Sequence, residues 1–159
     1  MTELMPGSLA PDFTLPTDNG GEITLSSLRG RKVVLFFYPK DDTPGCTAEA
    51  CAFRDNLQEF ESAGVRIIGL SQCSPRKHDR FKHKYKLSFP LASDQTGYVC
   101  EKYDVIKEKT MFGRKYMGIE RSTFLIDEQG RIQALWRKVS VPGHVEAVKS
   151  VLNDNRIAA

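Results

Sequence analysis

Residues 32–53 read KVVLFFYPKDDTPGCTAEACAF, and this stretch decides the fold. Its first part, residues 32–38, is a run of β-branched and aromatic residues, which is typical of a strand buried on both faces of a sheet. A polar turn follows, and then Thr43 and Pro44 stand in the order that begins many helices, an N-cap residue before a proline in the first turn. The stretch therefore predicts a central strand that leads directly into a helix.

Small and apolar residues recur along this predicted helix in steps of three and four, the spacing of one helical face. They are Cys46, Ala50, Phe53, Leu57 and Phe60. The stripe indicates a helix that packs against the sheet from residue 44 until Gly64 ends it.

The rest of the chain supplies the other parts of an α/β domain. Further strands are predicted at 65–70 and 89–91, and helical segments at 75–86, 94–103 and about 143–153. Turns that contain glycine predict two hairpins, 13–15 with 22–25 at one end of the sheet and 122–127 with 131–138. Residues 107–118 are expected to form an irregular basic loop. The pattern predicts a thioredoxin-like fold with a central mixed β-sheet flanked by helices and an N-terminal β-hairpin, as a single domain over 1–159.

Composition excludes several classes of protein. The chain has 159 residues, of which 40% are hydrophobic and 27% charged, the usual balance of a globular domain. Its 23 basic residues are interspersed with 20 acidic ones, so no nucleic-acid partner is expected. The longest apolar run has six residues, whereas a membrane span needs about 20. Residues 1–13 lack the pattern of a signal peptide, and we expect a cytoplasmic protein that does not bind membranes.

Four cysteines stand at positions 46, 51, 73 and 100. In a reducing compartment such cysteines act in catalysis, bind metals or pack in the core. No metal is expected, because the spacings of Cys73, His78 and His83 match no common zinc pattern. Cys46 is distinct because it falls in the first turn of a helix, where unpaired N–H groups and the helix dipole favour an anion. The sequence indicates a thiolate nucleophile in a partly closed pocket, with plain packing of Cys46 as the alternative.

The segment PKDDTPGCTAEAC, residues 39–51, contains Pro39, Thr43 and Cys46 at the spacing P-x-x-x-T-x-x-C. It resembles the active-site signature of peroxiredoxins and is similar to their bacterioferritin-comigratory (PrxQ) branch. The resemblance implies a thiol-dependent peroxidase of thioredoxin-like fold that reduces hydrogen peroxide and organic hydroperoxides. It implies no cofactor, and thioredoxin or a similar dithiol protein as reductant. The likeness extends over almost the whole chain, through the segments GSLAPDF (7–13), STFLID (122–127) and GH (143–144).

The resemblance also implies roles for individual residues. Cys46 matches the peroxidatic cysteine, which attacks the terminal peroxide oxygen and becomes a sulfenic acid. Thr43 matches the threonine whose hydroxyl contacts thiolate and peroxide, although N-capping alone would also explain a threonine here. Pro39 matches the proline that shields the site from water. Arg121 matches the arginine that enters the site from a neighbouring strand, and Glu49, in a C-x-x-E position, is expected to orient that arginine.

Cys51 matches the resolving cysteine of this branch. In a straight helix, two residues five apart have Cα atoms about 8–9 Å apart on different faces, whereas a disulfide requires less than about 7 Å. If Cys51 resolves the sulfenic acid of Cys46, the first turns of the helix must unwind in every cycle. Passive packing is the alternative for Cys51, while Cys73 and Cys100 match no position with a role.

The sequence is thus interpreted as a monomeric peroxiredoxin with a peroxide substrate. The alternative is a redox sensor or holdase without enzymatic activity, in which oxidation of Cys46 signals rather than detoxifies. Two basic features are assigned to the surface: the stretch 76–84, as a solvated helix face, and the imidazole of His144. The segment 107–115 is expected to be a solvated loop that borders the site.

Overall fold

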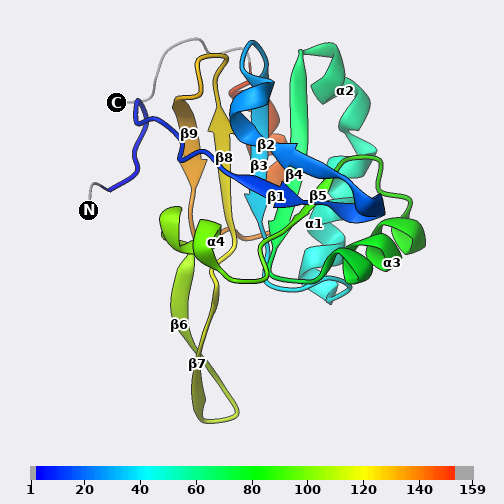
Figure 1. Cartoon of the computed structure of the whole chain (residues 1–159), viewed down its shortest axis with the longest axis vertical. Helices are drawn as coiled ribbons and strands as arrows, with labels where there is room; N and C mark the ends of the chain where they lie inside the picture. Colours follow the sequence, from blue (N-terminus) through cyan, green and yellow to red (C-terminus); the bar gives the residue numbers. More distant parts are fainter. Residues whose placement is uncertain (1–2, 153–159) are drawn as a thin grey trace.

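The computed structural model describes residues 3–152, which fold around a central mixed β-sheet (Figure 1). The strand order is β5–β4–β3–β8–β9. The strands are β3 (Lys32–Phe37), β4 (Val65–Ser71), β5 (Leu91–Ser93), β8 (Ser122–Ile126) and β9 (Ile132–Trp136). β3, β4 and β5 run parallel, whereas β8 pairs antiparallel with β3 and β9 antiparallel with β8. The predicted mixed sheet is confirmed.

β3 occupies the middle of the sheet and is buried along its whole length. Its side chains alternate between the two faces. Val33, Leu35 and Phe37 pack into a core on one face, and Val34 and Phe36 pack into a second core on the other. The continuous apolar run in the sequence therefore reflects a strand that has a hydrophobic core on each side.

Helices and a hairpin cover the two faces of the sheet. One core receives side chains from α1 (Pro44–Asp55), α2 (Leu57–Ser62), α3 (Pro75–Tyr85) and α5 (His144–Ser150). The other face carries α4 (Tyr98–Lys102) and the antiparallel pair β1 (Thr14–Pro16) and β2 (Glu22–Thr24). Short 3-10 helices are η1 (Asp18–Gly20) and η2 (Leu25–Leu28). The N-terminal hairpin is present as predicted, but it lies across a face of the sheet rather than at its end (Figure 1).

The helix predicted from residue 44 to Gly64 is divided in two. Asn56 interrupts it with φ −108° and ψ 7°. Its side-chain amide donates a hydrogen bond of 2.8 Å to the carbonyl of Ala52, so the side chain competes with the backbone for an acceptor of the helix. The apolar stripe continues across the break, since Phe53 and Phe60 pack in the same core.

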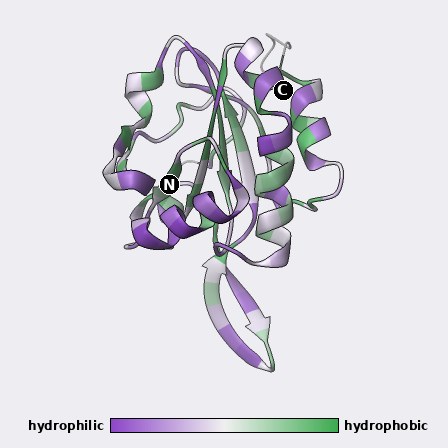
Figure 2. Cartoon of the chain, turned by 90° about the vertical axis from the view of Figure 1, so that its right-hand side faces the viewer, coloured by the Kyte–Doolittle hydropathy of each residue, from purple (hydrophilic) through white to green (hydrophobic). Residues whose placement is uncertain are grey.

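The irregular loop expected at 107–118 is wrong, because this segment forms a hairpin. β6 (Ile106–Met111) pairs antiparallel with β7 (Arg114–Ile119). Figures 1 and 2 show it projecting from the body of the protein, with hydrophobic and hydrophilic residues mixed along it. Phe112 and Gly113 connect the strands with φ of 53° and 76°, the two positive angles of a type I′ turn. Phenylalanine rarely adopts such an angle, so Phe112-Gly113 is not one of the residue pairs, such as Asn-Gly, that are typical of this turn.

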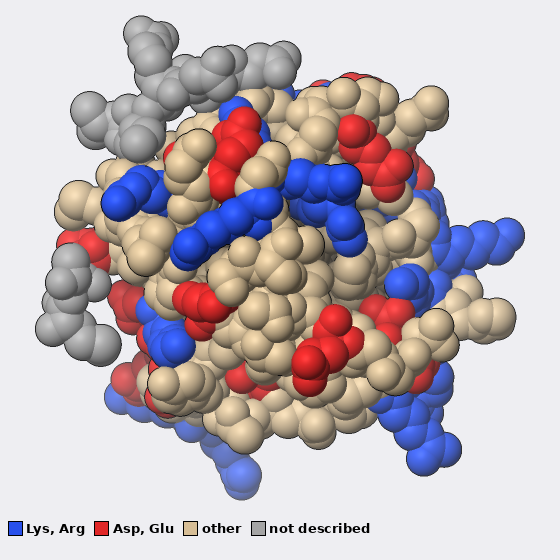
Figure 3. Space-filling model, turned by 45° about the horizontal axis from the view of Figure 1, so that its top comes forward, with Lys and Arg blue, Asp and Glu red and all other residues tan. Residues whose placement is uncertain are grey.

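The remaining differences concern the boundaries of elements. β5 begins two residues later than predicted. α5 ends at Ser150, and the predicted helix end at 153 lies outside the described residues. Within residues 3–152, no helix is both long enough and apolar enough to cross a membrane. On the face that Figure 3 shows, basic and acidic side chains are interspersed.

We predict that Phe53→Ala lowers the free energy of unfolding by about 3–5 kcal/mol, the usual result of removing a buried aromatic ring. Phe53 is fully buried, and its ring centroid lies 4.7 Å from that of Phe36. Phe112→Ala removes the same ring where it is 98% exposed, and it should change stability by less than about 0.5 kcal/mol. Urea unfolding measures both; equal losses would contradict the packing described for α1.

Candidate active site

Cys46 lies in the first turn of α1, directly after the turn that follows β3. Thr43 precedes the helix as its N-cap residue, and Pro44 occupies the first turn. Only 1% of Cys46 is exposed, yet the residue lines an open cleft of about 880 Å³ together with Pro39, Thr43 and Arg121. The thiol is therefore shielded from bulk water, while a small molecule in the cleft can reach it.

Arg121 lies between β7 and β8 and points its guanidinium at the first turns of α1. Its Nη2 donates to Cys46 Sγ at 3.3 Å, and its Nη1 donates to Glu49 Oε1 at 2.7 Å. Gly45 leaves space for this contact, because a Cβ atom at position 45 would lie 3.1 Å from Arg121 Nη2. The structure thus brings Cys46, Glu49 and Arg121 together in one hydrogen-bonded group.

The carboxyl group of Glu49 is fully buried. Burial raises its pKa to about 7, although the charge and hydrogen bond of Arg121 act in the opposite direction. Its Oε2 has no hydrogen-bond partner among the described residues, and His144 Nε2 lies 4.0 Å from it. Burial therefore outweighs the ion pair, and this carboxyl group changes its protonation near neutral pH.

His144 was expected at the surface, and that expectation is wrong. The residue is 5% exposed, and its Nε2 lies 2.8 Å from Thr123 Oγ1. Burial, with a smaller contribution from the charge of Arg121, lowers the pKa of His144 to about 4. The imidazole is neutral at pH 7 and forms part of the wall behind Glu49. The preceding Pro142 and Gly143 indicated the start of a helix but gave no signal of burial.

The hydroxyl of Thr43 does not cap α1. It donates a hydrogen bond of 2.8 Å to the carbonyl of Lys40, and no side-chain cap bond forms. N-capping therefore fails to explain this threonine. Because its hydrogen is engaged with Lys40 and the residue lines the cleft, the hydroxyl oxygen retains lone pairs with which it can accept a hydrogen bond from a bound molecule.

Cys51 is half-buried in α1, and all four cysteines are free thiols. Since Cys46 and Cys51 both lie within the helix, their Cα atoms are about 8–9 Å apart. Cys51 is not among the residues that line the cleft. Four of the six candidate residues thus line the cleft, namely Pro39, Thr43, Cys46 and Arg121. Glu49 joins them through its bond to Arg121, and Cys51 lies farther along the helix.

The β6–β7 hairpin forms the opposite wall of the cleft. This segment was expected to border the site, but as a solvated loop rather than as a hairpin with apolar side chains in the wall. Its apolar contributions include Met111, Tyr116, Met117 and Ile119, and Met117 is 64% exposed. Gly113 between two segments with β-branched and aromatic residues was the available signal, but the many lysines and arginines obscured it.

The basic stretch 76–84 is only partly the solvated face that was expected. Most of its charged side chains are exposed, but His78 and Phe81 are buried. In residues 3–152, no group of three or more His, Cys, Asp and Glu side chains is arranged to hold a metal ion.

A buried cysteine at the start of a helix, in contact with an arginine and open to a cleft, defines the class of thiol-dependent peroxidases when it stands on a thioredoxin-like sheet. A model of the AhpC/TSA family matches residues 6–135. The chain belongs to this family and is a peroxiredoxin of the Bcp (PrxQ) branch.

Known proteins of this branch match almost the entire chain. Peroxiredoxin Bcp of Bacillus subtilis is 49% identical over 148 residues, which cover 93% of this chain and 94% of the relative. The structure of PrxQ from Xylella fastidiosa superposes with a TM-score of 0.90 at 40% identity, covering 96% and 97% of the two chains. The bacterioferritin comigratory protein of Xanthomonas campestris, studied for its alkyl peroxide reduction activity, gives a TM-score of 0.84 at 45% identity over 88% and 89%. These structures confirm the predicted fold.

We predict that Glu49 makes the stability of the wild type depend on pH. Because the pKa of the carboxyl is about 7 in the folded protein and 4.5 for the free side chain, the folded state binds the proton more tightly. Between these values stability therefore falls as pH rises. Relative to Glu49→Gln, the free energy of unfolding of the wild type should fall by about 3 kcal/mol from pH 4.5 to pH 8, since one pKa unit corresponds to about 1.4 kcal/mol.

Urea unfolding of both proteins at several pH values gives this difference directly. His144 and the other titrating groups are present in both proteins, so their contributions largely cancel. If the difference in unfolding free energy between the wild type and Glu49→Gln stays constant from pH 4.5 to pH 8, then Glu49 is ionised throughout and its ion pair with Arg121 outweighs burial.

Proposed function

We propose that Cys46 is the peroxidatic cysteine of this thiol-dependent peroxidase and that Arg121 is the cation that assists it. The observation that carries the proposal is the bond from Arg121 Nη2 to Cys46 Sγ, 3.3 Å long, in a site where the other arm of the guanidinium is fixed by Glu49. This positive charge and the N–H groups of the first turn of α1 stabilise the thiolate.

In the first step the thiolate sulfur attacks the terminal oxygen of the hydroperoxide. A sulfur–oxygen bond forms, the oxygen–oxygen bond breaks, and Cys46 becomes a sulfenic acid. The second oxygen leaves with the electron pair, takes up a proton and departs as an alcohol, or as water when the substrate is hydrogen peroxide. Arg121 stabilises the negative charge as it moves from sulfur to the leaving oxygen, which is the form of catalysis that fixed donors provide best.

Thr43 and Pro39 hold the substrate and limit access of water. With its own hydrogen bound to Lys40, the hydroxyl of Thr43 can accept the O–H of the hydroperoxide and so aim the terminal oxygen at Cys46. Pro39 lines the cleft beside Thr43 and presents no N–H group to bind water.

The cleft supports organic hydroperoxides as substrates in addition to hydrogen peroxide. Its wall includes the apolar side chains of Met111, Met117 and Ile119, which offer contact to an alkyl group. The Xanthomonas campestris relative, whose alkyl peroxide reduction was studied, supports the same substrate class.

Cys51 then resolves the sulfenic acid. Its thiolate attacks Cys46 Sγ, the disulfide forms, and the sulfenic hydroxyl leaves as water after protonation. The first turns of α1 must unwind for this step, because the helix keeps the two residues about 8–9 Å apart. Unwinding is favoured by Glu49, whose buried Oε2 lacks a hydrogen-bond partner among the described residues and gains hydration when the helix opens.

The cycle closes when a dithiol protein of the thioredoxin type reduces the Cys46–Cys51 disulfide and itself becomes a disulfide. We propose that the chain works as a single domain over 1–159, as a monomer and in the cytoplasm. An intramolecular disulfide requires no second chain, and the reducing cytoplasm is where four free thiols persist.

Turnover and oxidation products of serine variants test this assignment. With thioredoxin, thioredoxin reductase and hydrogen peroxide, the wild type should turn over continuously, and Cys46→Ser should lose activity by on the order of 10³-fold or more. Cys51→Ser should lose thioredoxin-dependent turnover. Cys100→Ser is the matched control, because Cys100 is buried in the core away from the cleft, and it should remain active.

Mass spectrometry after one equivalent of peroxide identifies the products. The wild type should lose two hydrogens and yield linked peptides that contain Cys46 and Cys51, whereas Cys51→Ser should gain oxygen at Cys46. Pairing of Cys46 with another cysteine would refute the role of Cys51. A single oxidation event without turnover would refute the peroxidase assignment in favour of a redox sensor.

A further inference from the structure

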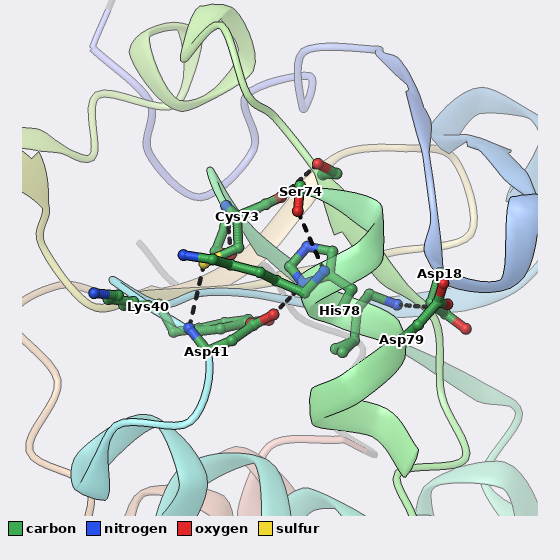
Figure 4. Close-up of polar contacts among 12 residues, drawn as sticks. Asp18, Lys40, Asp41, Cys73, Ser74, His78 and Asp79 are labelled. Carbon is green, nitrogen blue, oxygen red and sulfur yellow. Dashed lines mark hydrogen bonds and ion pairs between the residues drawn. The ribbon is translucent and has the colours of Figure 1, made fainter. Parts of the chain in front are cut away.

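A buried acid and histidine lie behind the active-site loop, residues 39–43, and take no part in the peroxide chemistry (Figure 4). Asp41 comes from this loop, and its side chain is 4% exposed, while His78 projects from α3 and is fully buried. His78 Nδ1 lies 2.7 Å from Asp41 Oδ2. Tyr38, which directly follows β3, donates its hydroxyl to Asp41 Oδ1 at 2.6 Å. Both carboxylate oxygens are therefore engaged.

The hydrogen bonds of His78 fix the orientation of its ring. Nε2 lies 3.0 Å from the carbonyl oxygen of Ala92 in β5, and a carbonyl only accepts, so Nε2 carries a hydrogen. A second hydrogen lies between Nδ1 and the carboxyl group of Asp41. Rotation of the imidazole would break both bonds inside the core, so the ring is a rigid link between the sheet, α3 and the loop.

Two further contacts fasten the same loop. The backbone N–H of Asp41 donates to Cys73 Sγ at 3.4 Å. Asp42, whose φ of 60° lies in the left-handed region, accepts hydrogen bonds from Lys84 and Tyr85 at the far end of α3. Consecutive carboxylates thus bind one helix, the first in the core and the second at the surface.

The link continues from Asp41 to the substrate cleft through one peptide plane. The carbonyl of Lys40 and the N–H of Asp41 belong to the same planar unit. The N–H is bound to Cys73, and the carbonyl accepts the hydroxyl hydrogen of Thr43. The orientation of this plane decides where the lone pairs of Thr43 point in the cleft.

We propose that His78 is a positioning residue for the peroxidase reaction. Through Asp41 it holds the Lys40–Asp41 peptide plane, which aims the hydroxyl of Thr43 at the hydroperoxide, and it keeps the loop in place while α1 unwinds beyond it. The inference rests on the proposed roles of Cys46 and Thr43, and it adds a residue of α3 that does not line the cleft.

Two isosteric variants separate the two bonds of the ring. In His78→Asn the side-chain amide takes the place of Nδ1 and keeps a donor toward Asp41. In His78→Gln the side-chain amide reaches the place of Nε2, so the variant keeps the bond to the Ala92 carbonyl and loses the bond to Asp41. We expect His78→Asn to react with hydrogen peroxide within about threefold of the wild-type rate. We expect His78→Gln to react about 10- to 100-fold more slowly, the range that follows when a reacting group is misplaced by up to an ångström.

Stopped-flow competition for hydrogen peroxide gives the rate of Cys46 oxidation, and iodoacetamide gives the reactivity of its thiolate. Alkylation should be unchanged in both variants, because Arg121 and the first turn of α1 remain. Equal peroxide rates for the two variants, whether both normal or both slow, would overturn the inference, since a purely structural role of α3 does not distinguish one ring nitrogen from the other.

Asp41 provides the second pair if the His78 variants do not fold. Asp41→Asn can still accept from Tyr38 and donate to an unprotonated Nδ1 of His78, and it should retain the wild-type rate, whereas Asp41→Ala should be slow. Equal rates for these two would also overturn the inference. Failure of Cys46 in the wild type to react with peroxide would instead refute the proposed function.

Discussion

The contact of one guanidinium with a thiol and a buried carboxyl group holds the active site together. Arg121 directly precedes β8, whose first residue Ser122 pairs with Phe37 at the end of β3. Two residues after Phe37 the chain enters the active-site loop, and so the register of the central sheet sets the distance between Arg121 and Cys46. A slip of one residue between β3 and β8 would turn every side chain of one strand to the opposite face and remove the cation from the thiol.

The predictions of β3 and of the start of α1 rested on local signals and succeeded. Two failures also had local causes, the positive φ of Phe112 in the β6–β7 turn and the side chain of Asn56 within the helix, whereas others depended on partners distant in the sequence. The apolar run of β3 and the Thr43–Pro44 start of α1 follow from backbone preferences alone, so the strand, the helix and the setting of Cys46 could be predicted. The burial of His78 and His144 could not, because each packs against elements that only the folded chain brings near. For Thr43 the backbone conformation was predictable, but the partner of its hydroxyl was not.

The proposed catalytic cycle requires the first turns of α1 in two states. Attack on peroxide needs the folded helix, whose N–H groups and bond to Arg121 stabilise the thiolate, and disulfide formation needs an unwound one. Glu49 contributes to both requirements. Its ionised carboxylate fixes Arg121, yet burial raises its pKa to about 7 and leaves Oε2 without a hydrogen bond among the described residues. The folded turn is consequently held with less free energy than its contacts suggest.

In the proposed cycle, the boundary between the loop that stays fixed and the helix that unwinds falls between Thr43 and Pro44. Upstream, Asp41 and Asp42 are bound to α3 through side chains that α1 does not supply. Downstream, Pro44 has no N–H group, and the first hydrogen bond across the boundary is the one from Thr47 N–H to the Thr43 carbonyl. When the helix opens, the Thr47 N–H leaves the Thr43 carbonyl. The loop keeps its own bonds to α3, so the opening does not displace it. On the proposed mechanism, Thr43 therefore stays in place to orient the peroxide while Cys46 moves toward Cys51.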